Sequence, residues 1–115
     1  MKQKKVFVIN YSGRKFRVPV RNVGFFRRGI GLMFRSPGTD NLLFSFARPC
    51  RVAITSWFVF SPFLAVWLDE KKRVLEYQIV KPFVLSLKPR FPSTFLLEIP
   101  CNQANLEVIG SLVGK

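Results

Sequence analysis

The sequence predicts a mainly β, small single-domain β-barrel-like fold with one or two short helical segments. Seven or so short runs rich in β-branched and aromatic residues are separated by turn signals, a spacing that indicates a small barrel or sandwich. Strands do not alternate with long helical patterns, which argues against a βαβ architecture. The chain has 115 residues, of which 49% are hydrophobic and 13 are Phe, so it can bury one core. We therefore treat residues 1–115 as a single domain.

The first 21 residues are expected to form a basic hairpin. Val6–Asn10 reads as a short strand, YSGR marks the turn, and KFRVPV follows with alternating apolar and polar residues. One face of this second strand should pack, whereas the other carries Lys15 and Arg17. Pro19 favours a position at a sheet edge, because proline has no amide hydrogen to donate. The apolar members of the alternation are Phe16, Val18 and Val20.

The middle and end of the chain are expected to hold further strands and little helix. The letters NVGFFRRGIGLMF predict a short helix with Asn22 as its N-cap, ended by the glycines. DEKKR, residues 69–73, reads as a charged turn, KPFVLSLKPRFPS as an extended connection, and NQANLEV as a turn of helix. The strand-like runs are Leu42–Phe46, Val52–Thr55, Phe63–Leu68, Val74–Val80 and Phe95–Ile99.

The uncharged run from Val52 to Leu68 is long enough to raise the question of a membrane span. It covers 17 residues, which is the short limit of the transmembrane range. It also contains polar residues, a central Pro62 and many β-branched and aromatic residues. Two buried strands joined at a proline corner therefore explain it better, and we expect no membrane span.

The charge of the chain is strongly positive and unevenly spread. There are 19 Lys and Arg against 6 Asp and Glu, for a formal net charge of +13. The segment from Met1 to Thr39 holds ten of the basic residues and no acidic residue. Such an imbalance predicts a polyanionic partner, and it places the electrostatic footprint in the N-terminal third.

Residues for catalysis or metal binding are scarce. The chain has no His, its six acidic residues are scattered, and no P-loop or G-x-G-x-x-G motif occurs. Asp69 and Glu70 are adjacent in a predicted turn and are expected to point apart into solvent. Cys50 and Cys101 lie far apart, so they favour two small apolar thiols, although a disulfide stays open. We therefore expect that the protein is not an enzyme and that it binds neither a cofactor nor a metal ion.

Several segments of the chain resemble one known family. RGIGLMFR, NLLFSF, FSPFLAVWLDEKKRVLE, KPF and FLLEIP follow one another in order from about residue 28 to residue 111. This series is similar to the domain-of-unknown-function 192 family, whose archaeal-type members carry an aromatic run where this chain has Trp57–Phe60. The resemblance implies a compact β-barrel-like fold without an established activity. It also implies that Leu32, Met33 and Phe34 are core, with Gly31 allowing close backbone approach, and that Arg28 and Arg35 are structural partners.

The chain departs from the family at three polar positions. Members commonly have His or Trp where this chain has Thr55, Asp where it has Leu64, and Asp where it has Ser111. If those positions form a ligand site in the family, the resemblance implies that this chain has lost it. A scaffold used for binding rather than chemistry is then expected.

These observations favour a non-enzymatic RNA-binding protein of the cytoplasm, ribosomal or ribosome-associated, whose basic surface contacts rRNA phosphates. Neighbouring ribosomal proteins are further expected partners. Arg outnumbers Lys in the N-terminal third, which suits bidentate phosphate contacts and base stacking, and Tyr11 is either a stacking residue or a packed turn aromatic. The expected RNA-binding residues are Lys2, Lys4, Lys5, Arg14, Lys15, Arg17, Arg21, Arg27 and Arg28.

Two alternatives remain open at the level of sequence. The first is a small β-barrel that binds an unknown small molecule or protein partner and has no nucleic-acid role. The second is attachment of the same basic face to an anionic membrane surface, although no amphipathic basic helix is evident.

Overall fold

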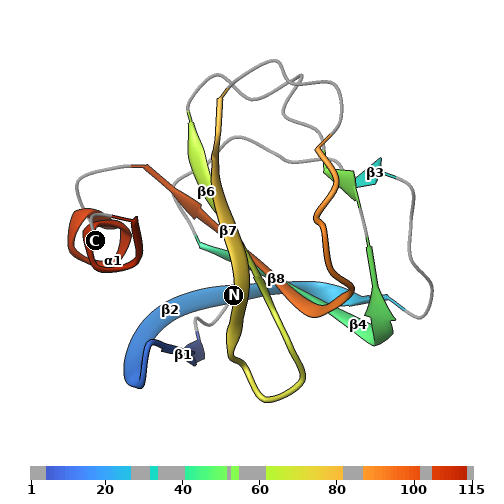
Figure 1. Ribbon diagram of the computed structural model, residues 1–115, viewed down its shortest axis with the longest axis horizontal. Coiled ribbons are helices and arrows are strands. Elements are labelled where there is room, and N and C mark those ends of the chain that lie inside the picture. Colours follow the sequence, from blue (N-terminus) through green and yellow to red (C-terminus); the bar gives the residue numbers. More distant parts are fainter. Residues whose placement is uncertain are drawn as a thin grey trace.

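A computed structural model describes residues 5–26, 32–33, 41–51, 53–54, 62–81, 87–101 and 105–113 of the chain. Within these ranges the chain is mostly β-strand and ends in one short helix (Figure 1). The elements are β1 (Lys5–Tyr11), β2 (Arg14–Phe26), β3 (Leu32–Met33), β4 (Leu42–Cys50), β5 (Ala53–Ile54), β6 (Phe63–Leu68), β7 (Val74–Val80), β8 (Ser93–Pro100) and α1 (Leu106–Val113).

Six strands form one curled sheet in the order β1-β2-β4-β8-β6-β7 (Figure 1). Strands β2 and β4 are parallel, and the other neighbours in this sheet are antiparallel. The sheet curls far enough that its first strand meets the start of its last one, where Asn10 and Arg73 form an isolated parallel bridge. The described part of the chain is therefore a barrel-like sheet, as the sequence predicts. A parallel pair, β3 and β5, forms a separate small sheet.

The β1–β2 hairpin has the register and the two-residue turn that the sequence predicts. Tyr11 pairs with Arg14, so Ser12 and Gly13 form the turn, with φ of 52° and 76°. Positive φ at both turn residues gives the twist that matches two antiparallel strands. Val18 and Val20 are buried and Phe16 is half-buried, whereas Lys15 and Arg17 are exposed. The basic outer face of this hairpin is thus confirmed.

Strand β2 corrects the expectation of a helix after Asn22. The strand continues through Phe26, and residues 21–26 pair in parallel with β4 across a register shift between Asn22 and Gly24. The valine and phenylalanines of this stretch suit a pleated strand, and Gly24 disfavours a helix by about 1 kcal/mol. Strand β4 lies about 20 residues downstream. Its backbone hydrogen bonds to β2 stabilise the strand more than an N-cap at Asn22 would stabilise a helix.

Pro19 is not in an edge strand of the sheet, but its own position has an edge character. Strand β2 pairs with β1 on one side over residues 14–20 and with β4 on the other side only from Arg21 onward. The side-chain amide of Asn41 donates a 2.9 Å hydrogen bond to the Pro19 carbonyl oxygen. Because β2 does not pair with β4 at Pro19, the missing amide hydrogen of this proline costs the sheet no hydrogen bond between strands.

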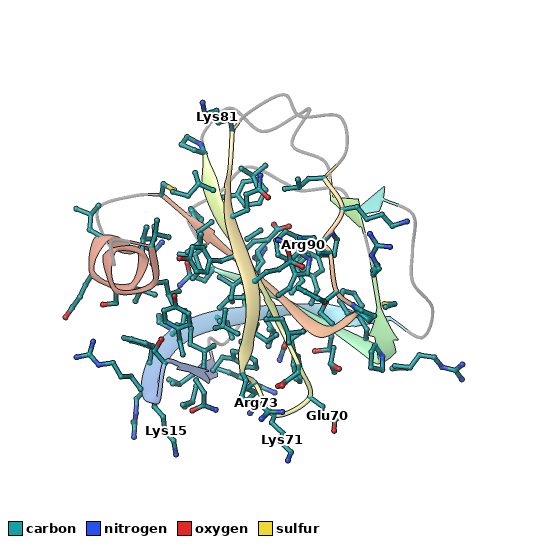
Figure 2. The ribbon with its side chains drawn as sticks, viewed as in Figure 1. Lys15, Glu70, Lys71, Arg73, Lys81 and Arg90 are labelled. Atoms are coloured by element: carbon teal, nitrogen blue, oxygen red, sulfur yellow. The ribbon has the colours of Figure 1, made fainter. Side chains whose placement is uncertain are left out.

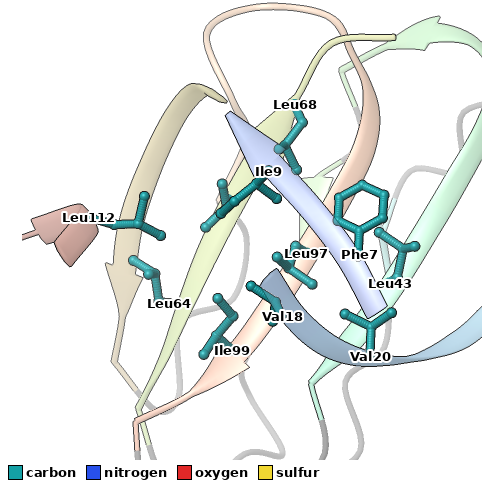
Figure 3. Packing of buried hydrophobic residues seen from close by; sticks show 11 residues of the cluster. Phe7, Ile9, Val18, Val20, Leu43, Leu64, Leu68, Leu97, Ile99 and Leu112 are labelled. Carbon is teal, nitrogen blue, oxygen red and sulfur yellow. The ribbon is translucent and has the colours of Figure 1, made fainter. Parts of the chain in front are cut away.

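The sheet is buried on both faces along its centre. Strand β6 is buried at every residue, and its alternating side chains separate into two clusters. Phe63, Ala65 and Trp67 pack on one face, whereas Leu64, Val66 and Leu68 pack on the other. The second cluster joins the inner face of the hairpin to Leu112 of α1 (Figure 3). The core therefore fixes both the hairpin and the helix against the same strands.

The remaining predicted elements agree with the structure in most places. The strands predicted at Phe63–Leu68 and Val74–Val80 have the observed bounds, and those predicted near β1, β4, β5 and β8 differ at their ends. The predicted turn of helix extends to eight residues as α1. In the part of the chain described, none of the helices is both long and apolar enough to span a membrane. Of the expected core residues, Phe34 and the side chains of Leu32 and Met33 lie outside the described residues. Gly31, Arg28 and Arg35 lie outside them as well.

Two glycine-to-alanine substitutions should change stability in opposite directions. Gly13 lies at φ 76°, where a Cβ atom is strained although no atom lies within 4 Å of it. Gly13→Ala should therefore lower the free energy of unfolding by about 1–2 kcal/mol. Gly110 lies inside α1 with open space around its Cβ position, so Gly110→Ala should raise stability by up to about 1 kcal/mol. Urea denaturation of both variants checks this, and two effects of the same sign would contradict it.

Candidate nucleic-acid interface

The closure of the sheet at Asn10 brings two hairpin turns together. The Asn10 backbone amide donates a 2.9 Å hydrogen bond to the Lys72 carbonyl oxygen, and its side-chain amide donates one of 3.3 Å to the Lys71 carbonyl oxygen. The β1–β2 turn and the β6–β7 turn, 60 or so residues apart in the chain, therefore lie side by side (Figure 2). Because both turns are basic, this closure concentrates positive charge at one end of the barrel.

Asp69 holds the β6–β7 turn in its shape. Its carboxylate accepts hydrogen bonds of 2.9 Å from the backbone amides of Lys71 and Arg73 and one of 2.8 Å from the Arg73 guanidinium. Burial alone would raise the pKa of Asp69, but these hydrogen bonds, from the Arg73 backbone and side chain and from Lys71, lower it overall. The expectation that Asp69 points into solvent was wrong, because the carboxylate folds back over its own turn. Glu70 is exposed as predicted.

An open groove lies between the two turns, and we call it the turn groove. Its volume is about 580 Å³. Lys15 stands on the side of the first turn, whereas Lys71 and Arg73 stand on the side of the second, and all three side chains lie at the same end of the molecule (Figure 2). None of the described residues that line it is acidic. The lining residues are Asn10, Tyr11, Ser12, Gly13, Lys15, Lys71, Arg73 and Val74.

A second groove, the helix groove, lies between the hairpin and α1 and has a volume of about 410 Å³. Lys15 lines this groove as well as the turn groove, so the two open on either side of the same lysine. Arg14 and Arg17 add positive charge here, and Glu107 of α1 adds one negative charge. The lining residues are Arg14, Lys15, Phe16, Arg17, Glu107, Val108 and Ser111.

Tyr11 lines the turn groove and is held by Tyr77. The two ring centroids are 5.9 Å apart and the ring planes meet at 84°, an edge-to-face contact. A hydrogen bond between the two phenols raises the pKa of Tyr77, with smaller contributions from burial and from the charge of Tyr11. Tyr11 is half-buried. It is therefore a packed turn aromatic that also lines the groove, and its role in stacking on a base stays a prediction.

Three of the six acidic residues are used within the fold. Asp69 bonds its own turn, and Glu76 accepts hydrogen bonds of 2.7 Å and 3.1 Å from the backbone amides of Arg90 and Phe91. Glu98 is fully buried in β8, opposite Leu42 of β4 and Ala65 of β6. Sequence reasoning missed the burial of Glu98, although its place in the apolar run FLLEIP is a signal that could have revealed it.

The expected RNA-binding residues that the structure describes differ in their exposure. Lys5, Arg14, Lys15 and Arg17 are exposed on the hairpin, and Arg21 is half-buried where β2 begins to pair with β4. Lys71 and Arg73 were missed, because only the closure of the sheet brings their turn to Lys15. The other expected residues, Lys2, Lys4, Arg27 and Arg28, lie outside the described part of the chain.

The three positions that depart from the resembled family do not form one cluster among the described residues. Leu64 has no exposed surface and packs in the apolar cluster with Ile99 and Leu112 (Figure 3). Ser111 is half-buried in α1 and lines the helix groove, and Thr55 lies outside the described residues. Cys50 and Cys101 are half-buried free thiols, and burial raises the pKa of both.

Removal of the Asp69 carboxylate should weaken the β6–β7 turn. Asp69→Ala is expected to lower the free energy of unfolding by about 1–2 kcal/mol at neutral pH, because three hydrogen bonds are lost. The lowered folded-state pKa means that this stabilisation is present above the unfolded value of about 4 and is lost as pH falls through the folded pKa. Urea denaturation at several pH values checks this, with Glu70→Ala as the control. Equal effects of the two variants would contradict the role of Asp69.

The tyrosine pair should be visible in a titration. The chain has two tyrosines, so NMR of protein with ¹³C-labelled tyrosine gives two signals that single Phe variants assign. Tyr77 should ionise above its ordinary pKa of about 10 in the unmodified protein and close to it in Tyr11→Phe. An unchanged Tyr77 midpoint in Tyr11→Phe would show that the two phenols are not hydrogen-bonded.

Comparisons with known proteins agree with the fold. No family model and no curated protein matches the chain. The chain is similar to a solved structure from Sinorhizobium meliloti 1021, described as a "putative transcription regulator", with 19% identity, a TM-score of 0.63, and coverage of 93% of this chain and 85% of that one. It is also similar to a protein of unknown function from Novosphingobium aromaticivorans DSM 12444, with 22% identity, a TM-score of 0.61, and coverage of 90% and 76%. At these identities the likeness shows the fold alone.

Proposed function

We propose that this protein is a non-enzymatic RNA-binding protein that contacts phosphates through the end of the barrel where its two basic turns meet. One observation carries the proposal. The closure at Asn10 sets Lys15 opposite Lys71 and Arg73 around an open groove, and none of the described residues lining that groove is acidic. Arg14 and Arg17 extend this basic surface along the helix groove, which Lys15 also lines, and Lys5 is exposed at the other end of the hairpin.

The chemistry of this surface suits dense phosphate. Lysine and arginine side chains that neutralise phosphates release condensed counterions, which supplies much of the affinity for nucleic acid. Arginine adds bidentate contacts to phosphate oxygens. Glu76 and Glu98 are turned toward the protein itself, and in the described part of the chain Asp69 pairs with Arg73 alone, so the lysines of the groove and the cations of the hairpin outnumber the acidic residues near them. A polyanion is therefore the partner that best balances the charge.

The finer part of the proposal is a ribosomal or ribosome-associated role in the cytoplasm, with rRNA as the partner. Small, very basic β-domains without catalytic groups suit packing against rRNA. We also propose that the chain is a diverged member of the domain-of-unknown-function 192 family, on the strength of RGIGLMFR and the segments that follow it. That membership concerns the fold and adds no activity.

The alternatives have weaker support. A small-molecule barrel would need an open interior near Leu64, yet Leu64 is fully buried among apolar side chains. DNA is a natural competitor to test, because one solved structure with this fold is described as a "putative transcription regulator".

Binding to RNA should depend steeply on salt and on the hairpin cations. If about six phosphates are contacted, the affinity for single-stranded RNA should fall roughly 300-fold between about 50 and 200 mM salt. The double variant Lys15→Gln/Arg17→Gln should lower the slope of log K against log salt by about 1.4. The matched double variant Lys81→Gln/Lys88→Gln removes the same charge elsewhere and should leave the slope unchanged.

Filter binding with RNA and with DNA of the same sequence measures these quantities. A flat salt response, or equal losses in the two double variants, would contradict the proposed surface, and tighter binding to DNA would contradict RNA as the partner. For the ribosomal role, sucrose-gradient sedimentation of a lysate at low salt should show the protein with a ribosomal subunit. Its presence only at the top of the gradient would contradict that role.

A further inference from the structure

The shape of the turn groove distinguishes between forms of RNA. A duplex presents its phosphates on a convex, wide surface, so it could touch only the tips of the two turns. Tyr11 and Val74, both half-buried, line the groove together with these turns. An extended single strand is narrower than a duplex, and its unpaired bases are free to contact a side chain of the groove.

The charges of the groove stand on two opposite sides. Lys15 belongs to the hairpin, and Lys71 and Arg73 belong to the β6–β7 turn. The Arg73 side chain keeps 62% of its surface exposed although its Nε atom donates to Asp69, so it can still meet a ligand. Lys72 is turned away, because its ammonium lies 5.1 Å from the centre of the Phe7 ring. Cations on both sides suit a phosphate held between them rather than a flat phosphate surface.

The described residues that line the groove include one aromatic ring, that of Tyr11. Tyr11 is held by its edge-to-face contact with Tyr77 and by the apolar cluster beneath it, so little conformational freedom is lost when a base stacks on it. Gly13, which also lines the groove, has no side chain that could block access to the ring, and open space surrounds its Cβ position. A base can therefore approach Tyr11 while its phosphate stays between the lysines.

We infer that the turn groove binds one nucleotide of single-stranded RNA, with the phosphate between Lys15 and the Lys71–Arg73 pair and the base stacked on Tyr11. This inference rests on the proposed function and narrows its substrate class to unpaired RNA. Because Lys15 also lines the helix groove, the strand continues across the hairpin toward Arg14 and Arg17. Charge alone would bind a duplex at least as well, so a preference for the single strand is the signature of the groove.

Fluorescence anisotropy with the full chain tests the inference, using a labelled oligouridylate and the same strand in a duplex with oligoadenylate. The single strand should bind about tenfold more tightly or better. Tyr11→Leu should weaken single-strand binding about tenfold and leave duplex binding unchanged, whereas Tyr11→Phe should retain it, since stacking needs the ring and not the hydroxyl. Lys71→Gln should weaken binding severalfold, and Lys81→Gln, at the opposite end of β7, should not (Figure 2).

The outcomes separate this inference from the proposed function. Equal affinity for strand and duplex, or unchanged single-strand binding by Tyr11→Leu and Lys71→Gln, would overturn the inference. If binding then still responded to salt and to the hairpin cations, the proposed function would stand. Absence of binding to either RNA at low salt would overturn both. Because Tyr11→Phe and Lys71→Gln alter single exposed or half-buried groups, they keep the test decisive even if Tyr11→Leu were to unfold.

Discussion

Two hydrogen bonds from Asn10 to the β6–β7 turn join the first strand of the sheet to the start of its last strand. The curl of a sheet follows from the twist of its strands, but closure needs a contact between the outer strands. Asn10 supplies that contact with both its backbone and its side chain. The position of every cation around the turn groove depends on this join, since the two turns come from distant parts of the chain.

The acidic residues explain how so basic a chain keeps its shape. Asp69 orders the turn that carries Lys71 and Arg73, and Glu76 holds the backbone ahead of β8 at Arg90 and Phe91. Each carboxylate accepts hydrogen bonds from backbone amides, so it stabilises local structure instead of pairing with the hairpin cations. Among the described residues that line the helix groove, Glu107 is the single acidic residue beside Arg14, Lys15 and Arg17, and this excess of positive charge is the physical reason to expect an anionic partner.

The elements that the sequence predicted well are those with strong local patterns. The alternation around Val18 and the continuous apolar run Phe63–Leu68 both form strands. A half-buried strand alternates apolar and polar residues and a fully buried strand is apolar throughout, so both patterns can be recognised in the sequence. The predicted helix after Asn22 was wrong because β2 pairs there with β4, a partner that local sequence does not reveal. Asp69 was misplaced for a similar reason, since its hydrogen bonds depend on the exact path of the turn.

By itself, the amino-acid sequence determined the β class of this protein, its basic hairpin with Lys15 and Arg17, and the excess of positive charge that calls for an anion. These properties follow from composition and short-range periodicity. Only the tertiary structure decided that Lys71 and Arg73 line one groove with Lys15 and that Tyr11 packs against Tyr77. Those relations join residues distant in the chain, and they exist only because the sheet curls until Asn10 reaches the opposite turn.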